Sequence, residues 1–180
     1  MPLVILQPCG NADAREHYKD TIENSVKFED VENLLTEEEK LRLKEIYPDG
    51  DMTIWGVTPG TNGQNAKRWE RMNEGDVTLL AQKGNIFASA VTTFKTHNKP
   101  LAAHLWNYDG KGQTWEYVYF LDEVKSHRIP YIEMNRIVGY KDNFVIQGFQ
   151  VLDEEKSDAL INAFDLESEV YFPSIKIEDV

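Results

Sequence analysis

The chain has 180 residues, of which 41% are hydrophobic, 28% charged and 11% aromatic, and its formal net charge is -12 at pH 7. These values exclude an intrinsically disordered chain, and no apolar run approaches the roughly 20 residues that a membrane-spanning helix needs. The single cysteine, Cys9, excludes an internal disulfide framework and leads us to expect a reducing, cytoplasmic environment.

The first part of the chain predicts one short strand and two helices. Residues 3–6 are a strand candidate that a proline and a glycine end, and Asn11 is placed to cap a helix over residues 13–21. Thr36 and Glu39 have the spacing of a capping box. A second helix is therefore expected to start there and to end at the turn sequence YPDGD.

From residue 52 onward, short apolar runs alternate with Gly, Asn and Pro turns, which predicts a series of strands and small helices. The tripeptide KGN is a hairpin signal between two of these strands. The predicted strands cover residues 52–57, 77–82, 86–95, 114–121 and 144–152, and the predicted helices cover residues 64–72, 101–106 and 153–164.

The order of these elements predicts an α+β domain built on a strongly curved sheet or small open β-barrel of five to six strands, flanked by short helices. We expect residues 1–51 to be a helical elaboration packed on the same domain. Residues 52–165 are expected to form the core, and residues 166–180 a C-terminal tail or edge strand.

No motif of the sequence indicates catalysis, a cofactor or a metal site. The four histidines lack the paired spacing of a zinc site, and the sequence has neither a GxSxG nucleophile motif nor a complete phosphate-binding loop. For His17, on the first predicted helix, we expect a structural hydrogen bond. The chain is therefore expected to be a binding domain, with any nuclease or NTPase activity on another domain or subunit.

The aromatic residues of the central region suggest a site for a planar ligand. Trp55 and Trp106 each end a predicted element and precede a loop rich in glycine or asparagine, where two indoles can sandwich a ring. In the segment TWEYVYF, alternation places Trp115, Tyr117 and Tyr119 on one face of a strand. We expect these three side chains to be core.

Positive charge is concentrated in the same central region, between acidic flanks. A local positive surface can attract phosphates even on an acidic protein, because the local potential decides docking. We expect six cationic residues to contact a nucleic-acid backbone: Lys67, Arg68, Arg71, Lys95, Lys99 and Arg128.

Residues 52–152 contain the succession of IWGVTPG, EGD, TLL, GNIFASAVT, LW and WEYVYFL. This succession resembles the EVE and YTH branches of the PUA-like superfamily. In particular, it is similar to the N-terminal specificity domains of McrB-type, modification-dependent restriction systems. The resemblance implies a small barrel-like sheet that binds methylated double-stranded DNA and flips the modified base into an aromatic cage. It favours N6-methyladenine, with 5-methylcytosine or its hydroxymethyl form as the alternative.

Carried over by position, Trp55 and Trp106 match the two cage tryptophans, and we expect their rings to face each other across a gap one nucleobase thick. The resemblance also implies fusion to, or action with, an AAA+ motor or a nuclease, so the chain is expected to be part of a longer protein. Two other interpretations stay open, an RNA-binding PUA-like domain and an interaction domain whose tryptophans are core. The further base-binding candidates are Gly56, Val57, Thr58, Asn65, Asn11 and Tyr108.

Overall fold

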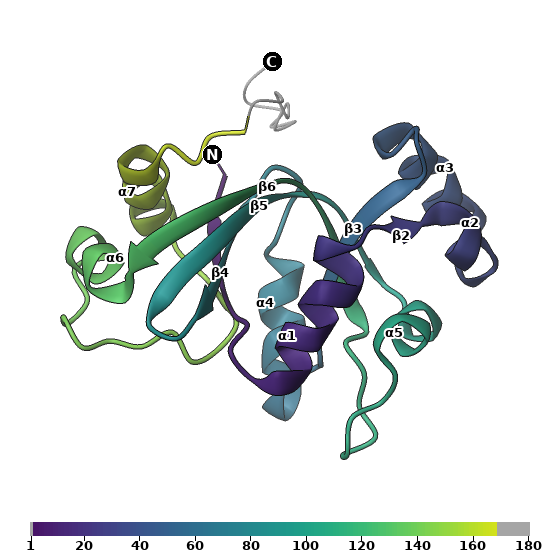
Figure 1. Ribbon diagram of the computed structural model, residues 1–180, viewed down its shortest axis with the longest axis horizontal. Helices are drawn as coiled ribbons and strands as arrows, with labels where there is room; N and C mark the ends of the chain where they lie inside the picture. Colours follow the sequence, from purple (N-terminus) through teal and green to yellow (C-terminus); the bar gives the residue numbers. More distant parts are fainter. Residues whose placement is uncertain (1, 169–180) are drawn as a thin grey trace.

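Seven strands form one mixed sheet in the order β2-β3-β6-β5-β4-β1-β7 (Figure 1). The computed structural model describes residues 2–168, and within them β1 and β4 are the parallel pair while the other neighbours are antiparallel. The strands are β1 (Val4–Pro8), β2 (Val26–Lys27), β3 (Asp51–Val57), β4 (Val77–Gln82), β5 (Asn85–His97), β6 (Tyr117–Pro130) and β7 (Gln150–Val151).

Short helices fill the connections between the strands. None of the helices between residues 2 and 168 has the length and hydropathy of a membrane-spanning helix. The α-helices are α1 (Ala12–Tyr18), α2 (Phe28–Val31), α3 (Glu37–Ile46), α4 (Gln64–Glu70), α5 (Lys99–Trp106), α6 (Tyr131–Val138) and α7 (Glu154–Phe164). A π-helical turn (Lys19–Glu23) follows α1, and 3-10 turns precede α3 and α4 (Glu32–Leu34 and Thr61–Gly63).

The two longest strands, β5 and β6, give the sheet its curvature. Their pairing shifts register at three places, between Ile86 and Ala88, between Ser89 and Val91, and between Thr92 and Phe94. Such irregularities bend a strand and increase its twist. Figure 1 shows both strands arching over the middle of the molecule, so that the sheet has a concave side.

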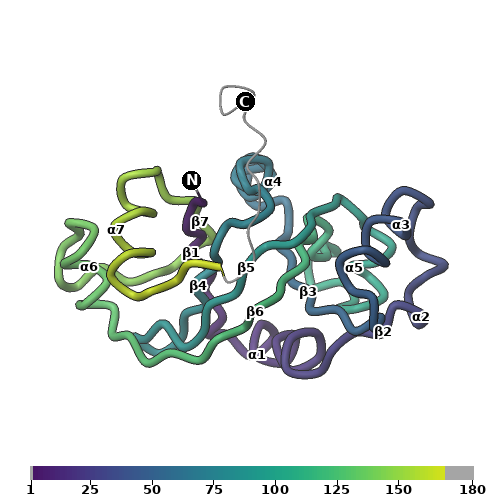
Figure 2. The backbone as a smooth tube through the Cα atoms, turned by 90° about the horizontal axis from the view of Figure 1, so that it is seen from above, coloured from purple at the N-terminus to yellow at the C-terminus, as the bar shows by residue number. Residues whose placement is uncertain are grey.

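Side chains that alternate along each strand divide the core between the two faces of the sheet. On β6, Tyr119 and Leu121 pack into the core of the concave side, whereas Val118 and Phe120 pack into the core of the opposite face. Helices α1 and α4 flank the concave side, one in front and one behind, as Figures 1 and 2 together show. On the opposite face, α6 and α7 cover the half that contains β1 and β4, and α2, α3 and α5 cover the half that contains β3 and β6.

Local signals in the sequence predicted several helix starts correctly. Thr36 and Glu39 form both hydrogen bonds of a capping box at the start of α3. Asn11 caps α1 because its side chain accepts a hydrogen bond from the backbone amide of Ala14, and Asp153 caps α7 in the same way. These elements form where the sequence satisfies the free backbone amides of the first turn.

The sheet has more strands than expected, and one of them is much longer. There are seven strands rather than five to six, because residues 1–51 contribute the short strand β2 in addition to β1, which was expected over residues 3–6. Strand β6 begins at Tyr117 rather than at residue 114, and it continues to Pro130, after which α6 begins directly. The edge strand considered for the C-terminal tail falls largely on residues 169–180, outside the described residues.

The strand expected over residues 144–152 is wrong except for Gln150–Val151, which pairs with β1. The side chain of Asn135 holds the preceding segment in a loop, since its Nδ2 donates to the carbonyl oxygens of Asp142 at 3.2 Å and Phe144 at 2.9 Å. A carbonyl group that is bonded to a side chain in this way takes no part in a ladder.

Candidate functional site

Four aromatic rings, those of His17, Trp55, Trp106 and Trp115, are in contact with one another, and we call them the aromatic cluster. The ring of Trp115 is the central one. Its centroid lies 4.8 Å from that of Trp55, 5.3 Å from that of Trp106 and 4.5 Å from that of His17. His17 also contacts Trp106, with a centroid distance of 6.1 Å.

Each ring of the cluster comes from a different element. Trp55 lies on β3, and Trp106 is the last residue of α5. Trp115 lies in the connection from α5 to β6, and His17 lies in the last turn of α1. The cluster therefore forms only when the sheet, two helices and a loop have come together.

Gly56 lets the connection from α5 to β6 pack directly on β3. A Cβ atom at this position would lie 2.5 Å from the carbonyl oxygen of Trp115 and 3.1 Å from Cζ3 of Trp106. No side chain fits at that separation, so glycine is the residue that permits this close approach of two backbone segments.

The expected open gap between Trp55 and Trp106 is wrong, because both indoles are buried and both pack against the ring of Trp115. Trp55 is fully buried and Trp106 is 5% exposed, whereas Trp115 and His17 are only partly buried. A ligand that approaches the cluster therefore meets His17 and Trp115 first.

Four buried polar side-chain atoms at this place have no hydrogen-bond partner among the described residues. They are Nε1 of Trp55, Nε1 of Trp106, Nδ1 of His17 and Oγ1 of Thr114, the residue before Trp115. Each such atom costs a fold about 1–3 kcal/mol. Because native proteins keep few of them, a group of four beside closely packed, mutually tilted aromatic rings indicates hydrogen-bonding capacity that a planar ligand could use.

His17 is a neutral imidazole at pH 7. Burial lowers its pKa, and the carboxylates of Asp13, Asp20 and Glu16 oppose this shift only in part. A neutral imidazole has one donor and one acceptor nitrogen. The structural hydrogen bond that we expected is not made by Nδ1. The hydroxyl of Thr21 donates instead to the backbone carbonyl of His17, at 3.1 Å.

The other base-binding candidates differ in how accessible they are. Val57 is buried in the core of the concave side. Thr58, directly after β3, and Asn65, in the first turn of α4, are partly buried. The side chain of Asn11 already caps α1. Tyr108, which follows Trp106 by two residues, has a side chain that is 55% exposed.

Three of the six cationic candidates hold the protein together. Arg68 and Arg71 each donate to a backbone carbonyl in or beside β7, at 2.8 and 3.3 Å. Lys95 donates to the carbonyl of Trp69 at 3.0 Å and lies 4.5 Å from the centroid of that ring. These contacts fix α4 against β7, at one edge of the sheet, and against β5, its central strand.

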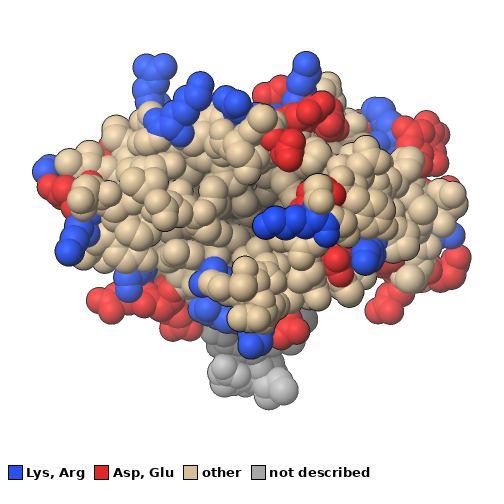
Figure 3. All heavy atoms as spheres, turned by 90° about the horizontal axis from the view of Figure 1, so that it is seen from below, with Lys and Arg blue, Asp and Glu red and all other residues tan. Residues whose placement is uncertain are grey.

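The remaining three cationic candidates, Lys67, Lys99 and Arg128, are exposed, and none forms a salt bridge within residues 2–168. Seen from the side into which the concavity opens, the molecule is hollowed near its centre (Figure 3). Lys and Arg side chains lie around this hollow, with Asp and Glu side chains between them (Figure 3). Positive side chains are thus available around the hollow in spite of the net charge of -12.

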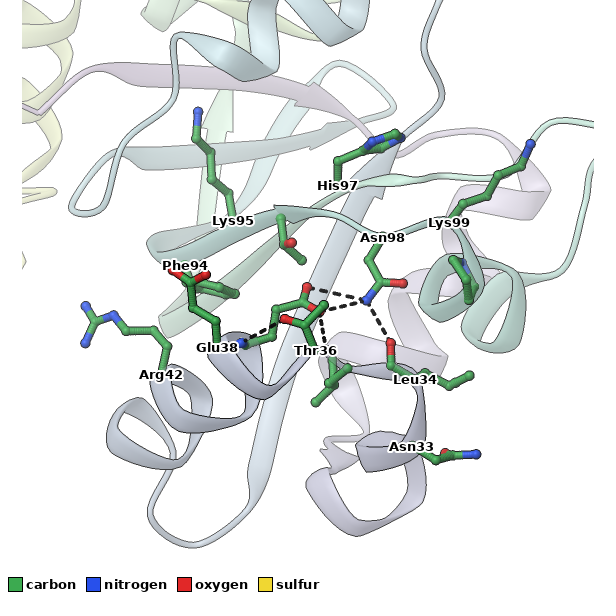
Figure 4. A pocket seen from close by; sticks show the side chains of 14 residues that line it. Asn33, Leu34, Thr36, Glu38, Arg42, Phe94, Lys95, His97, Asn98 and Lys99 are labelled. Atoms are coloured by element: carbon green, nitrogen blue, oxygen red, sulfur yellow. Dashed lines mark hydrogen bonds between the residues drawn. The ribbon is translucent and has the colours of Figure 1, made fainter.

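A separate cavity of about 840 Å³ lies between α3, β5 and the start of α5 (Figure 4). The Nδ2 of Asn98 joins its walls by donating to the Glu39 carboxylate at 3.2 Å and to the carbonyl oxygen of Leu34 at 2.9 Å. Figure 4 shows Lys95 and Lys99 extending away from these hydrogen bonds. No ring of the aromatic cluster lines this cavity, and its central polar groups are already bonded to one another. Within the described residues, no group of three or more His, Cys, Asp or Glu side chains is placed to hold a metal ion.

Three members of the site, Trp115, His17 and Thr114, were missed by reasoning from the sequence. Trp115 was assigned to a strand core, although it stands two residues after the loop NYDGKGQ, which Trp106 immediately precedes. That position beside a glycine-rich loop is the same signal that identified Trp55 and Trp106. No local signal distinguishes His17 or Thr114, because their neighbours in the cluster are distant in sequence.

No protein-family model matches the chain, and no curated protein matches it. Among solved structures, the N-terminal domain of Thermococcus gammatolerans McrB bound to m5C DNA is similar, with a TM-score of 0.64 at 15% sequence identity. The match covers 91% of this chain and 98% of that chain. The chain thus has the α+β fold of an McrB N-terminal domain, as its motifs predicted, with a mixed open sheet of seven strands rather than five to six.

Proposed function

We propose that this domain binds duplex DNA carrying a methylated base and takes that base out of the helix against the aromatic cluster. The observation that carries the proposal is a group of polar atoms without hydrogen-bond partners among residues 2–168, on Trp55, Trp106, His17 and Thr114, which lie among closely packed, mutually tilted rings. Aromatic rings stack on any nucleobase, whereas polar atoms select the edge of one base. The fold shared with an McrB domain solved on m5C DNA supports the same class of ligand.

The energy terms of this reaction are of comparable size. Flipping loses pairing and stacking worth a few kcal/mol. Stacking on an aromatic side chain returns about 1–3 kcal/mol per base, and each buried polar atom that gains a partner removes a cost of about 1–3 kcal/mol. A methyl group adds about 0.8 kcal/mol when it is buried. Binding is therefore favourable when both the base edge and the methyl group fit, which is the physical basis of discrimination.

The exposure of the rings determines the side from which the base enters. His17 and Trp115 are the partly exposed members, so the base passes them first, and the buried indoles of Trp55 and Trp106 form the floor of the site. Lys67 and Lys99 are exposed cations that can contact phosphates outside the site. In this proposal the acidic flanks of the chain play no part in DNA contact.

Two modifications are candidates for the base. The m5C DNA in the similar structure supports 5-methylcytosine, whereas the motifs of the sequence favour N6-methyladenine. Both place a methyl group on the edge of a base that would otherwise lie in the duplex, so both gain from an apolar site. We therefore propose a methylated-duplex reader and compare the two modifications in one experiment.

The decisive variant is Trp55→Phe, which keeps an aromatic ring in the floor and removes the indole N–H. Fluorescence titrations would compare duplexes that contain 5-methylcytosine, N6-methyladenine or no modification at one position. We expect the wild-type chain to bind one methylated duplex more tightly than the unmodified one. The variant is expected to lose about tenfold of this preference, the value of one buried hydrogen bond.

Trp69→Phe is the matched control, because the Trp69 indole already donates to the carbonyl of Val118 at 3.1 Å. That variant is expected to lower thermal stability and to keep the preference for methylated duplex. Equal affinity of the wild-type chain for all three duplexes would overturn the proposal, and tighter binding of single-stranded RNA of the same sequence would favour an RNA-binding domain instead.

We propose further that cleavage or translocation of the DNA belongs to an AAA+ motor or nuclease, on another domain or subunit. The similar structure is a DNA-bound N-terminal domain of McrB, which supports a role in specificity rather than catalysis. Finding an AAA+ motor or nuclease domain in the same polypeptide, or as a subunit that co-purifies with it, would support this proposal.

A further inference from the structure

The connection from α5 to β6, residues 107–116, begins and ends at the aromatic cluster. Trp106 immediately precedes it, and Thr114 and Trp115 lie near its end. Asn107 adopts a positive φ of 61°, which turns the chain away from the helix axis directly after Trp106. The loop therefore projects from the cluster itself, with its tip outside and both of its ends inside the candidate site.

This loop is held in one shape by its own hydrogen bonds. The Oδ1 of Asp109 accepts from the backbone amides of Lys111 at 2.8 Å and Gln113 at 3.0 Å. The backbone amide of Asp109 donates to the carbonyl of Gln113 at 2.7 Å, and that of Gly112 donates to the carbonyl of Asp109 at 3.0 Å. Four bonds within five residues make a closed turn that can carry a side chain in a fixed position.

Tyr108 is the large side chain that this loop presents. It is 55% exposed, and it stands two residues after Trp106, at the point where the closed turn begins. Burial in the fold accounts for the other aromatic residues nearby, since Trp106 is buried and Trp115 and Tyr117 are partly buried in the core. Burial in the core does not explain the ring of Tyr108, which is exposed beside the buried aromatic cluster.

We propose that Tyr108 enters the base stack of the duplex at the position that the flipped base leaves. The inference rests on the proposed function and gives Tyr108 a different role from a wall of the base site. A flipped base leaves a gap in which its former neighbours lose their stacking. Side chains of this kind stabilise an opened duplex by occupying the gap, and a planar ring restores stacking on both sides.

The proposal makes a distinction between duplex and single-stranded DNA. A methylated base in a single strand leaves no gap between paired neighbours, so filling a gap contributes nothing to its binding. Tyr108→Ala is therefore expected to weaken binding of the methylated duplex about tenfold and to leave binding of the methylated single strand within twofold. Tyr108→Phe keeps the ring and is expected to bind both as the wild-type chain does.

A second measurement reports on the gap directly. 2-Aminopurine beside the methylated base fluoresces weakly when it is stacked and strongly when it is not. At saturating protein, the wild-type complex should be dim and the Tyr108→Ala complex bright. Leu41→Ala, which removes another exposed apolar side chain, 68% exposed on α3, is the control for loss of surface area. Both tyrosine variants should unfold at the wild-type temperature, because the side chain is exposed.

The possible outcomes separate the two proposals. If Tyr108→Ala weakens duplex and single strand equally, Tyr108 contacts the base itself and does not fill the gap. If Tyr108→Ala leaves the affinity for both DNAs and the 2-aminopurine signal unchanged, Tyr108 is not part of the DNA interface. The proposed function still holds in that case, provided that the wild-type chain prefers methylated duplex. A wild-type chain without that preference would remove the proposed function.

Discussion

At Gly56 the aromatic cluster packs so closely on β3 that no Cβ atom fits. Its Cα faces the backbone of Trp115 on one side and the ring of Trp106 on the other. The first of these neighbours is a carbonyl group in the main chain, which cannot rotate away as the end of a flexible side chain can. The packing of Trp106 and Trp115 against β3 thus depends on the absence of a Cβ atom at residue 56.

Gly56→Ala is expected to displace the segment that carries Trp115 and to destabilise the domain by about 1–3 kcal/mol, the usual cost of overpacking a filled core. Thermal unfolding measures the loss of stability, and titration with methylated duplex measures the loss of affinity. Gly110→Ala is a suitable comparison, because a Cβ there meets no atom within 4 Å. Equal behaviour of the two variants would contradict the importance of this contact.

Half of the tryptophan arrangement could be predicted from the sequence, and half could not. Trp55 and Trp106 were identified because a glycine- or asparagine-rich loop follows each of them. Trp115 stands beside the same glycine-rich loop, but its place in TWEYVYF led us to assign it to the core of a strand, whereas β6 begins only at Tyr117. The contacts of Trp115 with Trp55 and His17 join segments that are distant in the sequence, and local patterns do not predict such contacts.

At the scale of elements, Asp76 joins the start of β1 to the turn between α4 and β4. Its two carboxylate oxygens accept from the backbone amides of Leu3 at 2.9 Å and Asn73 at 2.7 Å. Asp76 is only 3% exposed, and burial raises its pKa to about 6, although both hydrogen bonds and the charge of Lys95 act in the opposite direction. A buried carboxyl group therefore titrates at mildly acidic pH.

This titration predicts a specific pH dependence of stability. Between pH 3.8, the ordinary pKa of an aspartate, and about 6, the folded state binds the proton of Asp76 more strongly than the unfolded state does. The free energy of unfolding therefore decreases as the pH rises through this range, and this contribution is constant above it. Asp76→Asn cannot titrate, so the difference in melting temperature, wild type minus variant, should become smaller from pH 4 to pH 7. A difference that grows over this range would show that the pKa is not raised.

The elements that were predicted correctly are those with local causes. The capping box of Thr36 and Glu39 lies within four residues, and the KGN turn joins two adjacent strands. The expected strand over residues 144–152 was wrong because of a residue outside it, since the Asn135 side chain donates to the backbone carbonyl of Phe144, nine residues later. Alternating apolar residues there pack against α6 and α7 without forming a ladder.

At the scale of the whole molecule, the net charge of -12 opposes binding to any polyanion. Attraction therefore depends on a few exposed cations and should weaken steeply with salt, as each phosphate contact contributes about -0.9 to the slope of log K against log salt concentration. Arg68 and Lys67 are neighbours on α4 with different surroundings, because only Arg68 donates to a carbonyl group near β7.

Lys67→Ala is expected to reduce the salt slope of duplex binding by about 1 and to leave the preference for methylated DNA unchanged. Arg68→Ala is expected to lower the melting temperature, since it removes a hydrogen bond between α4 and residue 149. Titrations at several salt concentrations, with thermal unfolding of both variants, check this contrast. A larger change of slope for Arg68→Ala than for Lys67→Ala would reverse the assignment.

The pairing of β1 with both β4 and β7 has a consequence for how the chain is made. The strand nearest the N-terminus leaves the ribosome first, but one of its edges stays open until residues 150–151 have followed. An open strand edge readily pairs with other polypeptides, and closing so long a loop is slow. Folding during translation therefore finishes only when nearly the whole domain has been synthesised.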